Sequence, residues 1–336
     1  MLSAIFEAVG APLVVRERPM PKPRAGQALI RVCRCGICAS DLHMTGGGPF
    51  GVPIGSILGH EYAGEVVDTG EDGWLRPGDR VTALPLTACG QCAACRANTP
   101  LHCPSFGMMA GGYAQYTLID QRYAFRLPSS LSFEDGALVE PLAAALRGVR
   151  KLAVKDARVA VIGAGALGAA ALFWLHRESP AALVAIARSE RNAALAHAMG
   201  AVTLLSLGAN LPERLTEALG GAADIVVECA GAPGSLQRAL DLVRPGGSIL
   251  SLGGCVKPDT LLPALAMWKE VRILFSAAYG CDEFRHTLDL LNRGTAPPHD
   301  MIAETIALSE LPARFEAMRQ HGSRGKTLVD PWREIA

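Results

Sequence analysis

The chain has 336 residues, 50% of them hydrophobic, and its 32 basic and 32 acidic side chains give a net charge of zero. This length can form two globular domains, and the neutral balance offers no electrostatic attraction for a nucleic acid. No apolar run is long enough to cross a bilayer, and residues 1–9 lack the basic start of an export signal. We therefore expect a cytoplasmic protein with neither a membrane nor a nucleic-acid partner.

The first part of the chain, to about Pro128, is predicted to be a β-rich domain with a barrel-like or sandwich-like form. Short apolar segments separated by Gly and Pro indicate strands. They lie at Ala28–Val32, Glu65–Asp68, Arg80–Ala83 and Tyr116–Ile119. Cys33 and Cys35 alternate along such a segment, so they are expected to pack in the core although Cys35-x-x-Cys38 resembles a redox pair.

From about Asp156 onward, apolar runs alternate with Ala-rich helical stretches, which predicts parallel βαβ units. The predicted strands are Val159–Ile162, Leu183–Ile186, Val202–Leu205, Ile225–Glu228, Ser248–Leu252 and a late one at Leu274–Ala278. The predicted helices are Ala166–Glu178, Glu190–Met199, Leu211–Leu219, Gly234–Val243, Glu283–Asn292 and Leu308–Gln320.

Four cysteines have the spacing C-x2-C-x2-C-x7-C, namely Cys89, Cys92, Cys95 and Cys103. Ten cysteines are too few for a disulfide scaffold in a chain of this size, and four clustered thiolates suit a closed tetrahedral zinc site. An iron–sulfur cluster remains the alternative, because Pro104 follows the last cysteine. A closed site leaves no position for a substrate, so this lobe is expected to serve folding. Cys255 and Cys281 lie in no motif.

A second, open metal site is suggested by Cys38 in Gly-Ile-Cys, by His60 and Glu61 in Gly-His-Glu, and by Glu140 in Glu-Pro. Each segment alone is a weak signal. Glu140 follows what is predicted to be a polar turn, from which a third ligand could return to the other two. A catalytic zinc needs three protein ligands and one exchangeable position.

The segment Gly163-Ala164-Gly165-Ala166-Leu167-Gly168 follows a predicted strand and opens a predicted helix. This context predicts a dinucleotide-binding loop with the pyrophosphate at the helix N-terminus. Cys229-Ala230 and Gly253 follow later strands, at the edge of the sheet where the coenzyme would bind.

The coenzyme is predicted from the end of the second strand of this sheet, which runs into Ala187-Arg188-Ser189. An NAD enzyme places an acid there to bind the ribose hydroxyls. Ala187 instead leaves room for a 2′-phosphate, and Arg188 supplies a charged planar donor, with Ser189 and Arg191 as further donors. NADP(H) is therefore favoured, and the alternative is NAD(H) with Glu190 on the ribose.

Together the two metal motifs and the glycine loop resemble the zinc-dependent medium-chain dehydrogenase/reductase family over essentially the whole chain, especially its polyol, butanediol and secondary-alcohol branch. The resemblance implies a GroES-like catalytic domain at 1–145 that contains a zinc lobe at 87–105. A Rossmann domain with a doubly wound parallel sheet would follow at 146–282, and 283–336 would return to the catalytic domain.

The resemblance also implies two zinc ions per chain and assigns site residues. Cys38, His60 and Glu140 would hold the catalytic zinc, and Glu61 would enter the coordination sphere when water or substrate leaves. Many simple alcohol dehydrogenases have Cys in place of Glu140, whereas the polyol branch has Glu-Pro.

A proton relay is implied at Ser40 and His43, running from the bound hydroxyl through Ser40 and the nicotinamide ribose to His43. Asp41 would accept a hydrogen bond from the ring of His60. An ordinary turn aspartate and a surface histidine remain the alternatives for Asp41 and His43.

The expected function is that of a zinc-dependent alcohol dehydrogenase or carbonyl reductase acting on a secondary alcohol, diol or polyol. The alternatives are a zinc-free quinone or enoyl reductase of the same fold and a dinucleotide-binding sensor without turnover. The pocket is expected around Phe50, Leu84, Leu86 and Tyr279. The late strand Leu274–Ala278 resembles the family's edge strand for subunit pairing, so a homodimer or homotetramer is expected.

Overall fold

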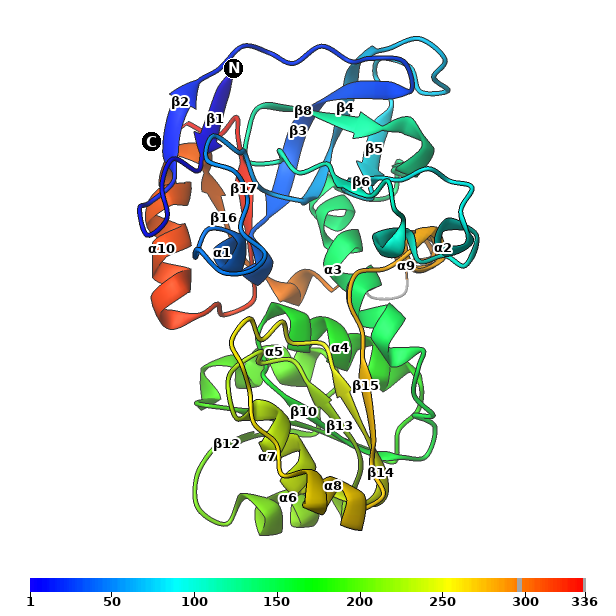
Figure 1. The fold of residues 1–336 in the computed structure, drawn as a ribbon, viewed down its shortest axis with the longest axis vertical. Coiled ribbons are helices and arrows are strands. Elements are labelled where there is room, and N and C mark those ends of the chain that lie inside the picture. Colours follow the sequence, from blue (N-terminus) through cyan, green and yellow to red (C-terminus); the bar gives the residue numbers. More distant parts are fainter. Residues whose placement is uncertain (295–297, 335–336) are drawn as a thin grey trace. The chain divides into compact units, whose positions relative to one another are not determined.

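The computed structural model describes residues 1–294 and 298–334, and the chain divides into two compact units (Figure 1). Unit 1 comprises Met1–Ala143, Tyr279–Gly322 and Lys326–Ala336, and unit 2 comprises Ala144–Ala278 and Ser323–Gly325. Residues 295–297 and 335–336 of the predicted C-terminal segment 283–336 lie outside the described residues. Both units therefore contain segments that are far apart in the sequence.

Unit 1 is built on a β-sheet with the strand order β16-β17-β3-β4-β5-β9, in which β8 also pairs with β3. Its strands are β3 (Gln27–Gly36), β4 (Glu61–Thr69), β5 (Arg80–Ala83), β8 (Tyr116–Asp120), β9 (Ala124–Arg126), β16 (Ile302–Ala307) and β17 (Lys326–Asp330). Two short pairs join β1 (Leu2–Ile5) to β2 (Val14–Glu17) and β6 (Leu86–Thr87) to β7 (Gly107–Met108). The long strand β3 is central and almost wholly buried, which confirms that Cys33 and Cys35 are packing residues.

The helices of unit 1 come from distant parts of the chain. They are α1 (Ala39–Met44), α2 (Ala93–Arg96), α3 (Phe133–Val149, which continues into unit 2), α9 (Cys281–Asn292) and α10 (Leu311–His321). One core cluster includes Ile30 of β3 together with Tyr113 and with Phe315 of α10. The rings of Tyr113 and Phe315 meet edge to face at 6.4 Å, so the C-terminal return is part of the same core.

The position expected for Glu140 after a polar turn is wrong, because Glu140 lies inside α3. The helix does not show an amphipathic pattern, since residues on all its sides are buried, and it contains Pro141. A helix buried all round has no polar stripe, and a proline in the sequence indicates a helix end rather than a helix interior.

Unit 2 has a parallel sheet with the strand order β12-β11-β10-β13-β14-β15, which confirms the predicted doubly wound Rossmann fold. Its strands are β10 (Arg158–Ile162), β11 (Ala182–Ala187), β12 (Thr203–Ser206), β13 (Ala223–Glu228), β14 (Val243–Ser251) and β15 (Arg272–Phe275). Its helices are α4 (Ala166–Arg177), α5 (Ala193–Ala198), α6 (Leu211–Leu219), α7 (Ser235–Leu242) and α8 (Pro263–Trp268).

The sheet of unit 2 is apolar on both faces, as parallel sheets covered by helices are. Ala160 and Ile162 of β10 share a core cluster with residues of α6 and α7. Val159 and Val161 alternate with them and are also fully buried, while α4 packs against β10 and β11.

Several predicted elements of the second half of the chain differ from the structure in their extent. The strand expected at Ser248–Leu252 is the longer β14, Val243–Ser251. The late strand is β15, Arg272–Phe275, instead of Leu274–Ala278, because its partner β14 ends at Ser251, which pairs with Phe275. The helix expected at Glu190–Met199 begins with a 3-10 turn before α5, and the one expected at Leu308–Gln320 begins with a 3-10 turn before α10.

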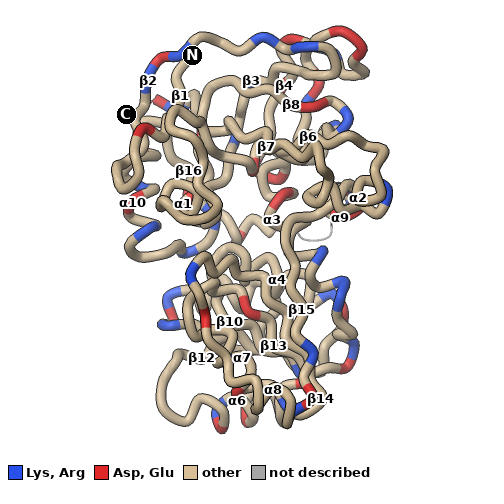
Figure 2. Tube along the Cα trace, viewed as in Figure 1, with Lys and Arg blue, Asp and Glu red and all other residues tan. Residues whose placement is uncertain are grey.

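Both units carry acidic and basic residues along the chain, and Figure 2 shows the two kinds interspersed along the trace. Within the described residues, none of the helices combines the length and the apolarity needed to span a bilayer.

Candidate functional site

Three of the predicted zinc ligands meet in unit 1. The ligand atoms of Cys38, His60 and Glu61 all lie within 4.8 Å of one another. Cys38 is the N-cap of α1, His60 directly precedes β4, and Glu61 opens that strand. Because β3 pairs antiparallel with β4 and Gly36 lies opposite Glu61, the end of one strand and the start of the next bring these ligands together.

Glu61 is fully buried and only partly satisfied by protein groups. Its Oε1 accepts a hydrogen bond of 2.6 Å from Nζ of Lys326, which is itself buried. Its Oε2 is buried and has no hydrogen-bond partner among the described residues. A Cβ on Gly36 would lie 2.0 Å from this oxygen, so only glycine leaves room for the carboxylate. A buried, unpaired carboxylate oxygen is costly without a cation, and sulfur, nitrogen and oxygen donors together suit zinc.

The ring of His60 is held in one orientation by a buried hydrogen-bond chain. Its Nδ1 lies 3.1 Å from Oδ1 of Asp41, whose Oδ2 accepts a bond of 2.5 Å from the hydroxyl of Tyr113. Burial alone would lower the pKa of His60, but Asp41 and Cys38 raise it well above its usual range. The surroundings of the ring therefore favour positive charge, which a bound metal ion would supply.

Glu140 reaches the same region from α3 but is not one of the three mutually close ligands. The hydroxyl of Tyr279 donates a hydrogen bond of 2.7 Å to its Oε1. Burial raises the pKa of Glu140 to about 7, and the neighbouring charges of His60 and Glu61 act on it in opposite directions. A cation beside this carboxylate would favour its ionised form.

The two expected relay residues lie on the same short helix. Ser40 and His43 both belong to α1, and Oγ of Ser40 lies 3.4 Å from Nε2 of His60. Burial, and then the guanidinium of Arg319, lower the pKa of His43. Arg319 is fixed by a hydrogen bond of 2.8 Å to the carbonyl of Leu42, so its charge stays near His43.

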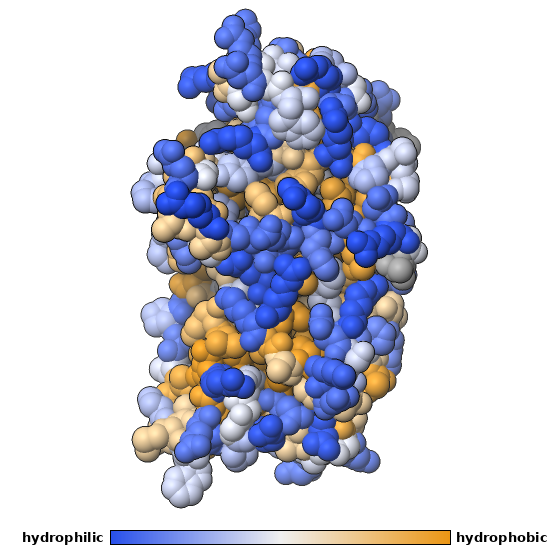
Figure 3. All heavy atoms as spheres, turned by 90° about the vertical axis from the view of Figure 1, so that its right-hand side faces the viewer, coloured by the Kyte–Doolittle hydropathy of each residue, from blue (hydrophilic) through white to orange (hydrophobic). Residues whose placement is uncertain are grey.

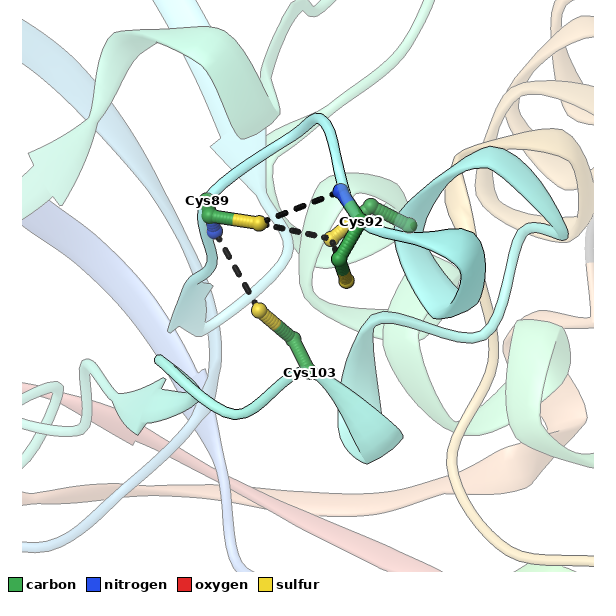
Figure 4. Close-up of side chains that lie close together, drawn as sticks. Cys89, Cys92 and Cys103 are labelled. Carbon is green, nitrogen blue, oxygen red and sulfur yellow. Dashed lines mark hydrogen bonds between the residues drawn. The ribbon is translucent and has the colours of Figure 1, made fainter.

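The sulfurs of the four lobe cysteines all lie within 4.8 Å of one another. Figure 4 shows three of these side chains, Cys89, Cys92 and Cys103, close together. Sγ of Cys95 lies 3.9 Å from that of Cys89 and 3.6 Å from that of Cys92. Backbone amides of Gln91 and Cys92 lower the pKa of Cys89 to about 6. Zinc–sulfur bonds of about 2.3 Å in a tetrahedron separate the sulfurs by about 3.8 Å, so the spacing fits one zinc ion.

In unit 2 the glycine loop joins β10 to α4, with Gly165 as the N-cap of the helix and Ala166 and Leu167 in its first turn. A Cβ on Gly168 would lie 1.7 Å from the carbonyl oxygen of Gly163. Only glycine therefore allows the helix to start this close to the strand, and the helix N-terminus is left available for a pyrophosphate.

The other expected coenzyme residues follow the ends of neighbouring strands. Ala187 is the last residue of β11 and is followed by the exposed Arg188 and Ser189. Cys229 and Ala230 follow β13, and Gly253 follows β14. All these positions are at the carboxyl edge of the parallel sheet.

Sequence reasoning missed several residues that shape these sites. Lys326 binds Glu61, and Tyr113 binds Asp41, each from a distant segment of the chain. The buried carboxylate of Glu228 accepts hydrogen bonds of 2.7 and 2.8 Å from the backbone N–H groups of Ala230 and Gly231. A carboxylate at the end of an otherwise apolar strand segment was the available signal for Glu228. Of the expected pocket residues, Leu84, Leu86 and Tyr279 are buried and Phe50 is 68% exposed.

Comparison with known families covers both halves of the chain. Residues 24–129 match the family described as the alcohol dehydrogenase GroES-like domain, and residues 166–293 match the family described as zinc-binding dehydrogenase. The first match confirms the GroES-like character expected for the β-rich part.

Individual relatives agree with these matches. The chain is 30% identical to (R,R)-butanediol dehydrogenase of Bacillus subtilis strain 168, over 93% of this chain and 94% of that protein. It is 31% identical to sorbitol dehydrogenase of the same strain, over 70% of each chain. A protein from Sinorhizobium meliloti 1021, described as a zinc-binding dehydrogenase and solved with NADP, superposes with a TM-score of 0.86 at 28% identity, over 98% of this chain and 99% of that one. The chain therefore belongs to the zinc-type medium-chain alcohol dehydrogenase family and is an oxidoreductase that acts on CH–OH groups.

Proposed function

We propose that this chain interconverts a secondary alcohol, diol or polyol and the matching carbonyl compound, using NADP(H) and a zinc ion held by Cys38, His60 and Glu140. The observation that carries the proposal is the cluster of Cys38, His60 and Glu61 with its unpartnered buried carboxylate oxygen. The butanediol and sorbitol dehydrogenases among its relatives support the substrate class. A zinc-free reductase or a sensor would leave this costly arrangement without a role.

When bound, zinc supplies a Lewis acid that lowers the pKa of the substrate hydroxyl. The chain's own residues orient the ligand side chains and would balance the charge of the ion. Asp41 and Tyr113 fix the ring of His60 so that Nε2 faces the ligand cluster. Cys38 and Glu140 supply negative charge, and Lys326 balances that of Glu61. Glu61, whose Oε2 has no hydrogen-bond partner among the described residues, would be a further ligand for the ion.

Ser40 would accept the proton released on oxidation while its own hydroxyl proton passes toward His43. Oγ of Ser40 lies 3.4 Å from Nε2 of His60, which places the hydroxyl at the edge of the ligand cluster. The lowered pKa of His43 keeps the ring neutral, and thus able to accept a proton, at a lower pH than an ordinary histidine.

The second zinc belongs in the four-cysteine lobe and supports folding. Distances of 3.6 and 3.9 Å between the sulfurs suit a single ion, whereas an iron–sulfur cluster would hold the sulfurs farther apart around its own sulfides. Thiolates that hold zinc must stay reduced, which supports a cytoplasmic location.

NADP(H) is supported by the end of β11, where Ala187 replaces an acid and Arg188 and Ser189 are exposed. The NADP in the related structure from S. meliloti agrees with this choice.

A homodimer or homotetramer in which chains pair through β15 is supported by the edge of the unit 2 sheet. β15 is the last strand in the order, and Phe275 at its end is 66% exposed. On the face that Figure 3 presents, hydrophobic residues gather over part of unit 2. An exposed apolar edge of this kind is a liability unless a second chain covers it.

The proposed function is tested by a screen of diols, sugar alcohols and simple secondary alcohols with NADP⁺ and with NAD⁺. The purified wild-type chain should oxidise at least one member, and Cys38→Ser should not, although this variant should still fold. Oxidation by Cys38→Ser at the wild-type rate would contradict the catalytic assignment.

A further inference from the structure

We propose that Tyr279 is a positioning residue for Glu140, and that Asn98 ties Tyr279 to the four-cysteine lobe, so that the lobe metal supports the geometry of the catalytic ligands. This inference rests on the proposed role of Glu140 at the catalytic zinc. It gives the lobe a part in the reaction beyond folding.

The first step of the argument is the contact between Tyr279 and Glu140. The tyrosine is 5% exposed and the glutamate 8%, and the hydroxyl donates a hydrogen bond of 2.7 Å to Oε1. The ring of Tyr279 packs on Phe284 of α9, with 5.9 Å between the ring centroids, and Phe284 is fully buried. A braced ring that binds one carboxylate oxygen limits the rotation of the glutamate side chain.

The second step is the turn that carries Tyr279. The next residue, Gly280, is the N-cap of α9, and its N–H donates to Oε2 of Glu283 at 2.9 Å. Nδ2 of Asn98 donates to the same oxygen at 3.0 Å. A Cβ on Gly280 would lie 1.9 Å from Oδ1 of Asn98, so the amide of Asn98 occupies the space beside the turn. The backbone next to Tyr279 is therefore held against Asn98.

The third step leads from Asn98 to the metal-binding cysteines. Asn98 follows α2, which contains Cys95, and its N–H donates to the carbonyl of Cys95 at 3.1 Å. Asn98 has a φ of +56°, a left-handed conformation that asparagine tolerates better than most residues. Figure 1 draws α2 and α9 side by side, in agreement with the hydrogen bond between Asn98 and Glu283. An ion bound to Cys95 would therefore also constrain the position of Asn98.

The test compares the holoprotein with Tyr279→Phe, with Asn98→Gly and with the double variant. Phenylalanine keeps the ring, and glycine keeps the left-handed backbone while it removes the amide. Thr99→Val is the matched control, because it removes a side-chain bond of 2.9 Å to the carbonyl of Ala94 inside the same lobe. The readouts are the rate at which a chelator removes the catalytic zinc, kcat and KM for a diol, and the unfolding temperature. The catalytic zinc is the ion that Cys38→Ser lacks.

Loss of the positioning bond should release the catalytic zinc about 10-fold to 100-fold faster in Tyr279→Phe, and kcat should fall with it. Asn98→Gly should give a smaller change in the same direction and no further change in the Tyr279→Phe background, because it acts through Tyr279. Thr99→Val should behave as wild type.

A wild-type rate of zinc release in Tyr279→Phe would overturn the positioning role, and independent effects of the two substitutions would overturn the link through Asn98. Failure of the proposed function would give a different result from these two. A wild-type chain that holds only the lobe zinc would overturn the catalytic zinc site and, with it, this inference.

Discussion

Replacing Lys326 with methionine tests whether the buried ion pair with Glu61 stabilises unit 1. Nζ of Lys326 lies 2.6 Å from Oε1 of Glu61, and the two side chains are 3% and 0% exposed. Nζ also donates to the carbonyl of Ile37 at 3.2 Å. Methionine keeps the apolar stem but leaves the carboxylate without its cation, in surroundings that water does not reach.

The expected cost follows from this burial. Removing one partner of a buried pair costs about 3–5 kcal/mol, because the remaining charge is uncompensated. Arg16 and Glu7 are an internal comparison, since their atoms are also 2.6 Å apart but the side chains are 57% and 37% exposed. Water and salt screen such a pair, so Arg16→Met should change the free energy of unfolding little. A catalytic zinc beside Glu61 should partly compensate the lost lysine, so the cost should be larger after chelation.

The assay is urea unfolding of wild type, Lys326→Met and Arg16→Met, each with zinc and after treatment with a chelator. Burial lowers the pKa of Lys326, but Glu61 and Cys38 raise it above its ordinary value. A raised pKa means that the lysine contributes its stability throughout the range below its ordinary pKa, so the cost should be the same at pH 7 and pH 9. Equal changes for Lys326→Met and Arg16→Met would refute the reasoning.

Three further predictions concern the lobe, the relay and the coenzyme. Cys92→Ser should lower the unfolding temperature more than Cys38→Ser does, measured by calorimetry, because a closed metal site supports folding, and equal temperatures would argue against that role. His43→Gln should slow alcohol oxidation roughly 100-fold and remove the fall in rate at low pH. In wild type this fall should occur at a pH below the ordinary histidine pKa, because the pKa of His43 is lowered. An unchanged pH profile would exclude the relay. Arg188→Ala should weaken NADPH binding about 10-fold to 150-fold in a fluorescence titration and leave NADH binding unchanged. Ala187→Asp should shift the coenzyme preference toward NADH. Tighter binding of NADH than of NADPH by wild type would contradict the assignment.

The Rossmann sheet was predictable because each strand is a short apolar run and each crossover has helical periodicity. The glycine loop added a motif whose meaning depends only on the strand before it and the helix after it. Among the elements that were not predicted are the strands β1, β2, β16 and β17 and the helix α3. β2 is partly exposed along its length, and α3 lacks a polar face and contains Pro141. Hydrophobic periodicity therefore did not predict elements whose residues are all buried or nearly all exposed.

The metal ligands were predictable because cysteine, histidine and glutamate lie in short segments with recognisable spacing. Their supports were not, because each comes from a distant part of the chain. Tyr113 lies 72 residues from Asp41, Tyr279 lies 139 residues from Glu140, and Lys326 lies 265 residues from Glu61. Such pairings are created by the sheet and the C-terminal return, and no local pattern records them.

Zinc content per chain tests the central claim most directly. Metal analysis of the purified holoprotein should give two zinc ions for wild type, and one for Cys38→Ser, which retains the lobe cysteines and should have lost alcohol oxidation. One zinc in wild type, or two in Cys38→Ser, would contradict the claim that Cys38, His60 and Glu140 hold a catalytic zinc.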